Sequence, residues 1–125
     1  MPKNDLVVKS NQVIEASYTL TTIEQRLILS AIAQIPKGEP VTDEVIYTVS
    51  VADLQKFGAN ETTAYRDLKE SVSRLFDRSI VLRSSDRTSR TRWVQKIDFM
   101  DSRGVIGIRF SKDILPFLSN LSTEF

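Results

Sequence analysis

The sequence predicts a mixed α+β domain. Apolar side chains recur at helical spacing in residues 21–35 and 52–76, whereas residues 80–110 hold short runs of β-branched and aromatic residues separated by polar turns. A short helix, a glycine and a longer helix precede these strands, which is the outline of a helix-turn-helix. Because a β-hairpin is expected directly after it, the predicted fold is a winged helix with additional N- and C-terminal helices.

The N-terminal part is predicted to hold two helices. Residues 1–9 are expected to be extended, and a short helix is expected over Ser10–Ser17. Thr21 and Glu24 have the spacing of a capping box, in which a hydroxyl and a carboxylate satisfy free backbone N–H groups at a helix start. The apolar residues of this second helix are Leu27, Ile28, Ala31, Ile32 and Ile35. Pro36 is expected to end it.

The helix-turn-helix is predicted to follow a short strand. Val45–Val49 is β-branched and aromatic, as strands prefer. Ala52–Phe57 is the expected first helix, and Gly58 permits a tight turn after it. Asn60 is expected to cap the second helix, which covers Glu61–Asp77 and buries an apolar stripe.

Three strands and a broken helix are predicted to complete the chain. The strands are expected at Ile80–Arg83, Arg92–Phe99 and Val105–Phe110. The first two form a hairpin across the polar residues 84–90, and this hairpin is the wing. Residues 112–121 are expected to form a helix that Pro116 kinks or breaks into two turns, because proline lacks a backbone N–H donor.

The composition excludes several kinds of chemistry. The 125 residues contain no His and no Cys, which excludes a hydrolase triad, a thiol protease and a cysteine-ligated zinc site. The sequence has no glycine-rich phosphate loop, and no apolar run approaches the roughly 20 residues that span a bilayer. We therefore expect a single binding domain rather than an enzyme, with no metal, cofactor, membrane or small-molecule substrate.

The net charge of +1 hides an asymmetry between the two halves of the chain. Residues 1–62 carry 5 basic and 8 acidic side chains. Residues 63–125 carry 12 basic and 8 acidic side chains, and 9 of these 12 cations are arginines. Arginine favours bidentate contacts with phosphates and base edges. The basic half therefore indicates a polyanionic partner.

The outer face of the predicted helix Glu61–Asp77 is one candidate for that contact. Its cationic residues are Arg66, Lys69 and Arg74. A helix that enters the major groove of DNA needs such a face opposite an apolar one. The alternative is a solvated amphipathic helix, because Asp67 and Glu70 dilute the positive charge and Arg66 can pair with Glu70.

The predicted hairpin is the second candidate. Its arginines are Arg78, Arg83, Arg87, Arg90 and Arg92, with Asp86 as the opposing acid. Arginines on a polar loop can reach a phosphate backbone or a narrow minor groove. The alternative is a hydrophilic hairpin tip that binds nothing. A third possibility is the stacking of single-stranded bases on the neighbouring aromatic residues Tyr65, Trp93 and Phe99.

The last predicted strand is a candidate for self-association. Its apolar residues are Val105, Ile106, Gly107 and Ile108. A small winged domain leaves strand edges open, and pairing of two such edges across a two-fold axis would protect them. The alternative is that the adjacent helices cover the strand.

Three segments, taken in order, carry a family resemblance. The first contains Ser10-Asn11 and Glu24-Gln25-Arg26, and the second is VADLQKFGANETTAYRDLKESVSRL. The third matches a closing pattern at Ile108, Phe110, Ser111, Leu115, Pro116 and Leu118. Together they resemble the N-terminal winged-helix domain of plasmid replication initiators of the RepE/RepA-like superfamily, over essentially the whole chain.

The resemblance implies a function. Such initiators are plasmid-encoded bacterial proteins of the cytoplasm that bind repeated origin sequences, called iterons, in double-stranded DNA. They form homodimers and work with host replication proteins. Residues 1–125 would then be the first domain of a two-domain initiator, and the resemblance favours the arginine-rich hairpin over the helix as the DNA contact.

Two other functions stay open at the level of the sequence. One is a winged-helix transcriptional repressor that binds an operator, because fold alone does not separate it from an initiator. The other is a protein-interaction module that dimerises and binds little DNA of its own.

Overall fold

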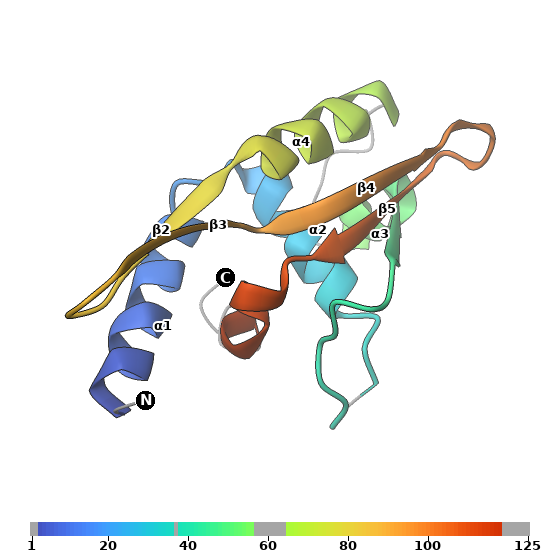
Figure 1. Cartoon of the computed structure of the whole chain (residues 1–125). Coiled ribbons are helices and arrows are strands. Elements are labelled where there is room, and N and C mark those ends of the chain that lie inside the picture. The colour runs from blue at the N-terminus through green and yellow to red at the C-terminus, as the bar shows by residue number, and fades with distance from the viewer. Residues whose placement is uncertain (1–2, 37, 57–64, 119–125) are drawn as a thin grey trace.

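A computed structural model describes residues 3–36, 38–56 and 65–118 (Figure 1). The helices are α1 (Lys3–Ser17), α2 (Thr22–Ile32), α3 (Val51–Lys56) and α4 (Tyr65–Asp77), with short 3-10 helices η1 (Asp101–Arg103) and η2 (Lys112–Ile114). The strands are β1 (Tyr47–Ser50), β2 (Ser79–Arg83), β3 (Thr88–Arg92), β4 (Val94–Met100) and β5 (Val105–Phe110). The mixed α+β prediction is confirmed.

The strands form two separate antiparallel sheets. One has the order β1-β5-β4, and the other is the β2–β3 hairpin. The hairpin points away from one end of the molecule, and the turn between β4 and β5 lies at the other end (Figure 1). Helix α4 packs on β4 and α2, while α1 packs on β2.

The predicted pairing of Ile80–Arg83 with Arg92–Phe99 is wrong. Only Arg92 belongs to the hairpin, as the last residue of β3, and β3 otherwise occupies residues 88–91, of which 88–90 were expected to be loop. Trp93 is buried at a bend between β3 and β4, and its carbonyl accepts the Ser111 N–H at 3.1 Å. As a result β3 pairs with β2, whereas β4 pairs with β5. The loop of the hairpin shrinks to residues 84–87.

The predicted extended start is also wrong, since α1 is one continuous helix from Lys3. Tertiary packing supports it: Val13 is fully buried, and the helix lies against β2. The Gln12 side-chain amide bonds both the N–H and the carbonyl of Arg83, at 2.7 and 3.2 Å. This amide therefore takes the place of a neighbouring strand at the edge of β2.

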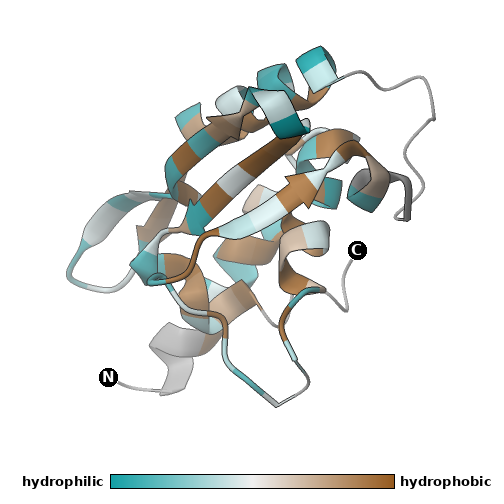
Figure 2. Cartoon of the chain, turned by 90° about the vertical axis from the view of Figure 1, so that its right-hand side faces the viewer, coloured by the Kyte–Doolittle hydropathy of each residue, from teal (hydrophilic) through white to brown (hydrophobic). Residues whose placement is uncertain are grey.

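The capping box of α2 is confirmed. Thr21 Oγ1 accepts the Glu24 N–H at 3.2 Å, and Glu24 Oε1 accepts the Thr21 N–H at 3.4 Å. The helix ends at Ile32, one turn before Pro36. Its inner face joins a core that spans the helices and both sheets, and Figure 2 shows hydrophobic positions along the strands and on the helices packed against them.

Both helices of the predicted helix-turn-helix are present as α3 and α4. The turn between them, with Gly58 and Asn60, lies outside the described residues. Helix α4 buries Leu68, Val72 and Leu75, which leaves the opposite side of the helix exposed. The predicted break at Pro116 is not seen in the described residues, because η2 passes directly into α-helical backbone over residues 115–118.

The expectation that β5 offers a free edge for dimerisation is corrected. Strand β5 is the middle strand of its sheet, with β1 on one side and β4 on the other. Ile106 and Ile108 are fully buried, Gly107 is buried and Val105 is half-buried. None of the helices in the described part of the chain is long and apolar enough to cross a membrane.

Candidate nucleic-acid interface

The β2–β3 hairpin carries three arginines on one face. Directly opposite residues of an antiparallel pair share a face, and alternate residues of a strand face the same way. Ile80 and Leu82 are buried toward α1. Arg83, Arg90 and Arg92 lie on the outward face, because Arg90 is opposite Val81 and Arg92 is opposite Ser79. All three are exposed. We call these three residues the arginine face.

Arg92 joins the arginine face to the end of α4. Its guanidinium lies 5.0 Å from the centre of the Phe76 ring, and Nη1 donates to the Phe76 carbonyl at 3.4 Å. A cation near a helix C-terminus is stabilised by the free carbonyls there. The outward surface of the hairpin is therefore continuous with the last turn of α4.

A shallow depression of about 340 Å³ lies at this junction. It is lined by Arg90 and Arg92 from β3, Ser79 from β2 and Asp77 from α4. Neither Arg83 nor Arg90 makes an ion pair within the described part of the chain. The arrangement can accept phosphate groups, since arginine on a solvated surface keeps its donors available for bidentate contacts.

The outer side of α4 is less suited to a polyanion. Its exposed charged residues alternate in sign: Arg66, Glu70, Arg74 and Asp77. The Arg66 guanidinium also lies 3.9 Å from the Asp67 carboxylate. The positive and negative charges of this stripe balance, so α4 attracts phosphates more weakly than the hairpin does.

Lys69 is engaged within the protein. Its ammonium lies 3.1 Å from Asp101 Oδ1 and sits 5.5 and 5.3 Å from the ring centres of Tyr65 and Phe99. The Tyr65 hydroxyl lies 3.0 Å from the same carboxylate oxygen. The hydrogen bond from Lys69, and then that from Tyr65, hold the pKa of Asp101 below its ordinary value of 3.8. Burial and the Asp101 carboxylate raise the pKa of Tyr65.

Arg78, one of the predicted DNA contacts, is engaged by a carboxylate of the interior. Its guanidinium forms a two-point ion pair with Glu24, with Nε bonded to Oε2 and Nη2 bonded to Oε1 at 2.9 Å. The Glu24 side chain is fully buried. Burying a carboxylate without a partner is costly, so Arg78 serves the interior rather than the surface.

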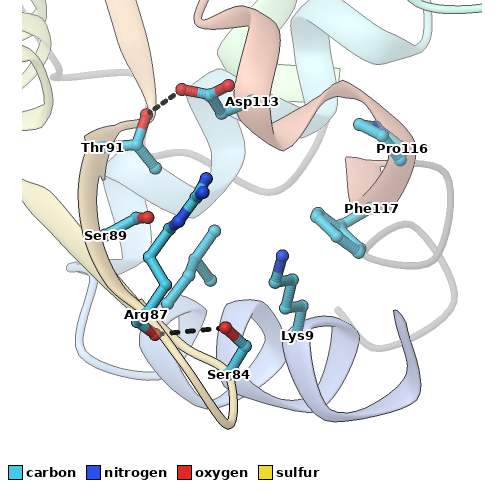
Figure 3. A pocket seen from close by; sticks show the side chains of 9 residues that line it. Lys9, Ser84, Arg87, Ser89, Thr91, Asp113, Pro116 and Phe117 are labelled. Carbon is cyan, nitrogen blue, oxygen red and sulfur yellow. Dashed lines mark hydrogen bonds between the residues drawn. The ribbon is translucent and has the colours of Figure 1, made fainter. Parts of the chain in front are cut away.

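Arg87 lies apart from the arginine face. Figure 3 shows its side chain directed into a hollow between α1, the inner side of the hairpin and the chain after β5. Lys9 of α1 points into the same hollow. Sequence reasoning missed Lys9, because the segment around it was expected to be extended and no local pattern connects it to the hairpin.

The described residues offer little basis for a metal centre. They contain no group of three or more acidic, His or Cys side chains that could hold an ion. Of the aromatic residues proposed for base stacking, Trp93 is buried, and Tyr65 and the exposed Phe99 flank Lys69.

Comparisons with known proteins agree on one family. The family model described as "Initiator Replication protein, WH1" matches residues 6–125. The crystal structure of the WH1 domain of MSBI1.176, a replication protein isolated from a multiple sclerosis patient, is 32% identical with a TM-score of 0.82, and the match covers 97% of each chain.

A second solved structure shares the fold. The Pi initiator protein, crystallised in complex with iteron DNA, is 23% identical with a TM-score of 0.71. The match covers 89% of the present chain and 48% of Pi, so the chain spans about half the length of that initiator.

Proposed function

The chain belongs to the WH1 family of initiator replication proteins, and on this premise we propose that it binds double-stranded DNA at a plasmid origin through the outward surface of the β2–β3 hairpin. The family is non-catalytic, in agreement with the missing His and Cys. The proposed function is therefore binding of DNA without a chemical reaction. The observation that carries it is the arginine face.

The hairpin makes the main contacts with the DNA backbone, and α4 makes weaker ones. Arg83 and Arg90 have no ion-pair partner among the described residues and bind phosphates, and Arg92 is held in place by Phe76. Such contacts fix the register of a protein on the duplex but carry little sequence information. Arg66 and Arg74 on α4 make weaker, auxiliary contacts, whereas Arg87 faces the hollow on the other side of the hairpin and takes no part in this contact.

Iteron DNA is the proposed target. The Pi initiator shares the fold and was crystallised with iteron DNA. In this proposal the hairpin binds the phosphates of the duplex. A further domain of a longer, two-domain initiator recognises the base sequence. An operator-binding repressor would use the same surface, so the test includes origin repeats and unrelated duplex.

The test removes two arginines of the arginine face. Arg83→Gln combined with Arg90→Gln should weaken binding to origin-repeat duplex by about a hundredfold or more, because two hydrogen bonds to charged groups of roughly 1.5–3 kcal/mol each are lost. Lys96→Gln with Arg103→Gln is the matched control: both residues are exposed, and the change in charge is the same. Equal affinities for the two double variants would overturn the proposal.

Self-association is a second proposed function, with β4 rather than β5 as the strand that contacts a second copy. Within the described residues β4 pairs with β5 alone, which makes it an edge strand, and Phe99 on it is exposed. Unpaired strand edges promote pairing with a second chain. Sedimentation at increasing concentration should show a dimer that Phe99→Lys weakens; a strictly monomeric protein would contradict it. Contacts with host replication proteins stay a prediction.

A further inference from the structure

The hollow on the inner side of the hairpin is a distinct feature of the surface. It has a volume of about 310 Å³ and is bounded by α1, the inward residues of β2 and β3, and the segment after β5. This size is at the lower end of small-molecule sites in proteins, roughly 300–1,000 Å³. It lies on the opposite face of β2–β3 from the arginine face, since Leu82 and Ser89 are paired and face inward.

Two cationic side chains line this hollow. The Arg87 guanidinium comes from the hairpin tip and the Lys9 ammonium from α1 (Figure 3). No ion pair of either side chain is found with the residues of 7–36, 38–53 and 65–118, whose side chains the structure describes. The lining holds these two cations and one acid, Asp113. The two like charges repel each other, and an anion between them removes that repulsion.

The rest of the lining supplies hydrogen-bonding groups and an apolar wall. Ser89 contributes a hydroxyl, and the Thr91 hydroxyl lies 3.2 Å from Asp113 Oδ2. Asp113 keeps further acceptor capacity for a donor group on a ligand. Pro116 and Phe117 form a wall on the side opposite the hairpin (Figure 3), against which a planar ring can pack.

We propose that this hollow binds a nucleotide-sized phosphate ester. The phosphate lies between Lys9 and Arg87, where the guanidinium matches its geometry. A sugar hydroxyl donates to Asp113, and the base packs on Phe117. Such a phosphate ester occurs in two kinds of ligand: a free nucleoside monophosphate, and the 5′-phosphate at the end of a DNA strand. The site does not depend on DNA binding by the arginine face.

The experiment titrates the intact chain with 2′-deoxyadenosine 5′-monophosphate, followed by the NMR chemical shifts of the Ser89 and Thr91 amides. We expect saturable binding, and at least tenfold weaker binding of 2′-deoxyadenosine, which lacks the phosphate. Lys9→Gln should weaken nucleotide binding by about tenfold, whereas Lys112→Gln, an exposed lysine outside the hollow, should leave it unchanged.

Short single strands with and without a 5′-phosphate form the second arm. Saturable binding of the mononucleotide supports a free nucleotide as the ligand; binding of the 5′-phosphorylated strand alone supports a strand end. Absence of saturable binding in both arms overturns the proposal, as does equal binding of the nucleoside. The nucleoside comparison uses the unaltered protein, so it decides even if Lys9→Gln does not fold. Affinity for unphosphorylated duplex is measured separately and tests the arginine face alone.

Discussion

The Glu24 carboxylate makes both a helix-cap hydrogen bond and an ion pair. Its Oε1 completes the capping box of α2 by accepting the Thr21 N–H, and both oxygens bind the Arg78 guanidinium. The carboxylate is fully buried, whereas the Arg78 side chain is 31% exposed. Because water cannot replace a lost partner at Glu24, the pair ties the start of α2 to the chain between α4 and β2.

Arg78→Ala should therefore destabilise the fold. Removing one partner of a buried ion pair costs about 3–5 kcal/mol, and we expect about 3 kcal/mol here because Arg78 is partly solvated. Urea unfolding measures the loss. Arg74→Ala, four residues earlier on the exposed side of α4, should change stability by less than about 0.5 kcal/mol. Equal effects would show that the ion pair contributes nothing.

Asp101 predicts a dependence of stability on pH. Its pKa is held below the ordinary 3.8 by the hydrogen bonds from Lys69 and Tyr65. A carboxyl whose pKa is lowered by folding stabilises the folded state above its unfolded pKa and loses that contribution as the pH falls through its folded pKa. Stability should thus decline as the pH falls below about 4, and Asp101→Asn should flatten this decline. Identical acid profiles would contradict the assignment.

The sequence predicts where arginines cluster but not what each single arginine contacts. The composition predicted an arginine-rich hairpin, and the register places Arg83, Arg90 and Arg92 on its outward face. Arg78 stands five residues before Arg83 and carries the same charge, yet it binds a buried acid 54 residues away. No local pattern encodes that pairing, because it depends on how α2 packs against α4.

At the scale of elements, Gly107 shows how closely the neighbouring segments cover β5. A Cβ on Gly107 would lie 2.6 Å from Ile46 Cγ2 and 3.3 Å from Met100 Cε. The strand is covered on this side by residues of both neighbouring segments. The groups that approach Gly107 belong to the same chain rather than to a second copy.

Gly107→Ala should destabilise the three-stranded sheet. The added methyl group overlaps the branched Ile46 side chain, which has little freedom to move, and overpacking costs about 1–3 kcal/mol. Thermal unfolding should show a lower midpoint. Ser102→Ala, at an exposed position of the neighbouring turn, serves as the control and should leave the midpoint within error. A midpoint unchanged by Gly107→Ala would mean that Ile46 is free to yield.

Strand pairing was harder to predict than strand location. Each predicted strand overlaps an observed one, and α2 begins at the predicted capping box, but β3 lies mostly in residues that were expected to be loop. The alternation of residues 92–99 is continuous, however, and shows no sign that the segment changes sheets. The change occurs at the buried Trp93, whose carbonyl accepts the Ser111 N–H, a hydrogen bond between distant segments. The helical start of α1 depends in the same way on its packing against β2.

At the scale of the whole molecule, net charge and DNA affinity are separate quantities. The chain carries 17 basic and 16 acidic side chains, so its long-range attraction to DNA is weak. Binding by the hairpin therefore depends on local contacts, in which each neutralised phosphate releases condensed counterions. The number of such contacts, rather than the net charge, determines the response to salt.

The salt dependence of duplex binding counts these contacts. With about four phosphates neutralised by Arg74 and the arginine face, log K should fall against log salt with a slope of about −3.6, because each contact contributes about −0.9. Arg83→Gln combined with Arg90→Gln should reduce the steepness by about 1.8. Lys96→Gln with Arg103→Gln changes the net charge equally but lies on the other hairpin, so the slope should stay the same. If both double variants shift the slope alike, binding follows net charge, and the arginine face has no special role in it.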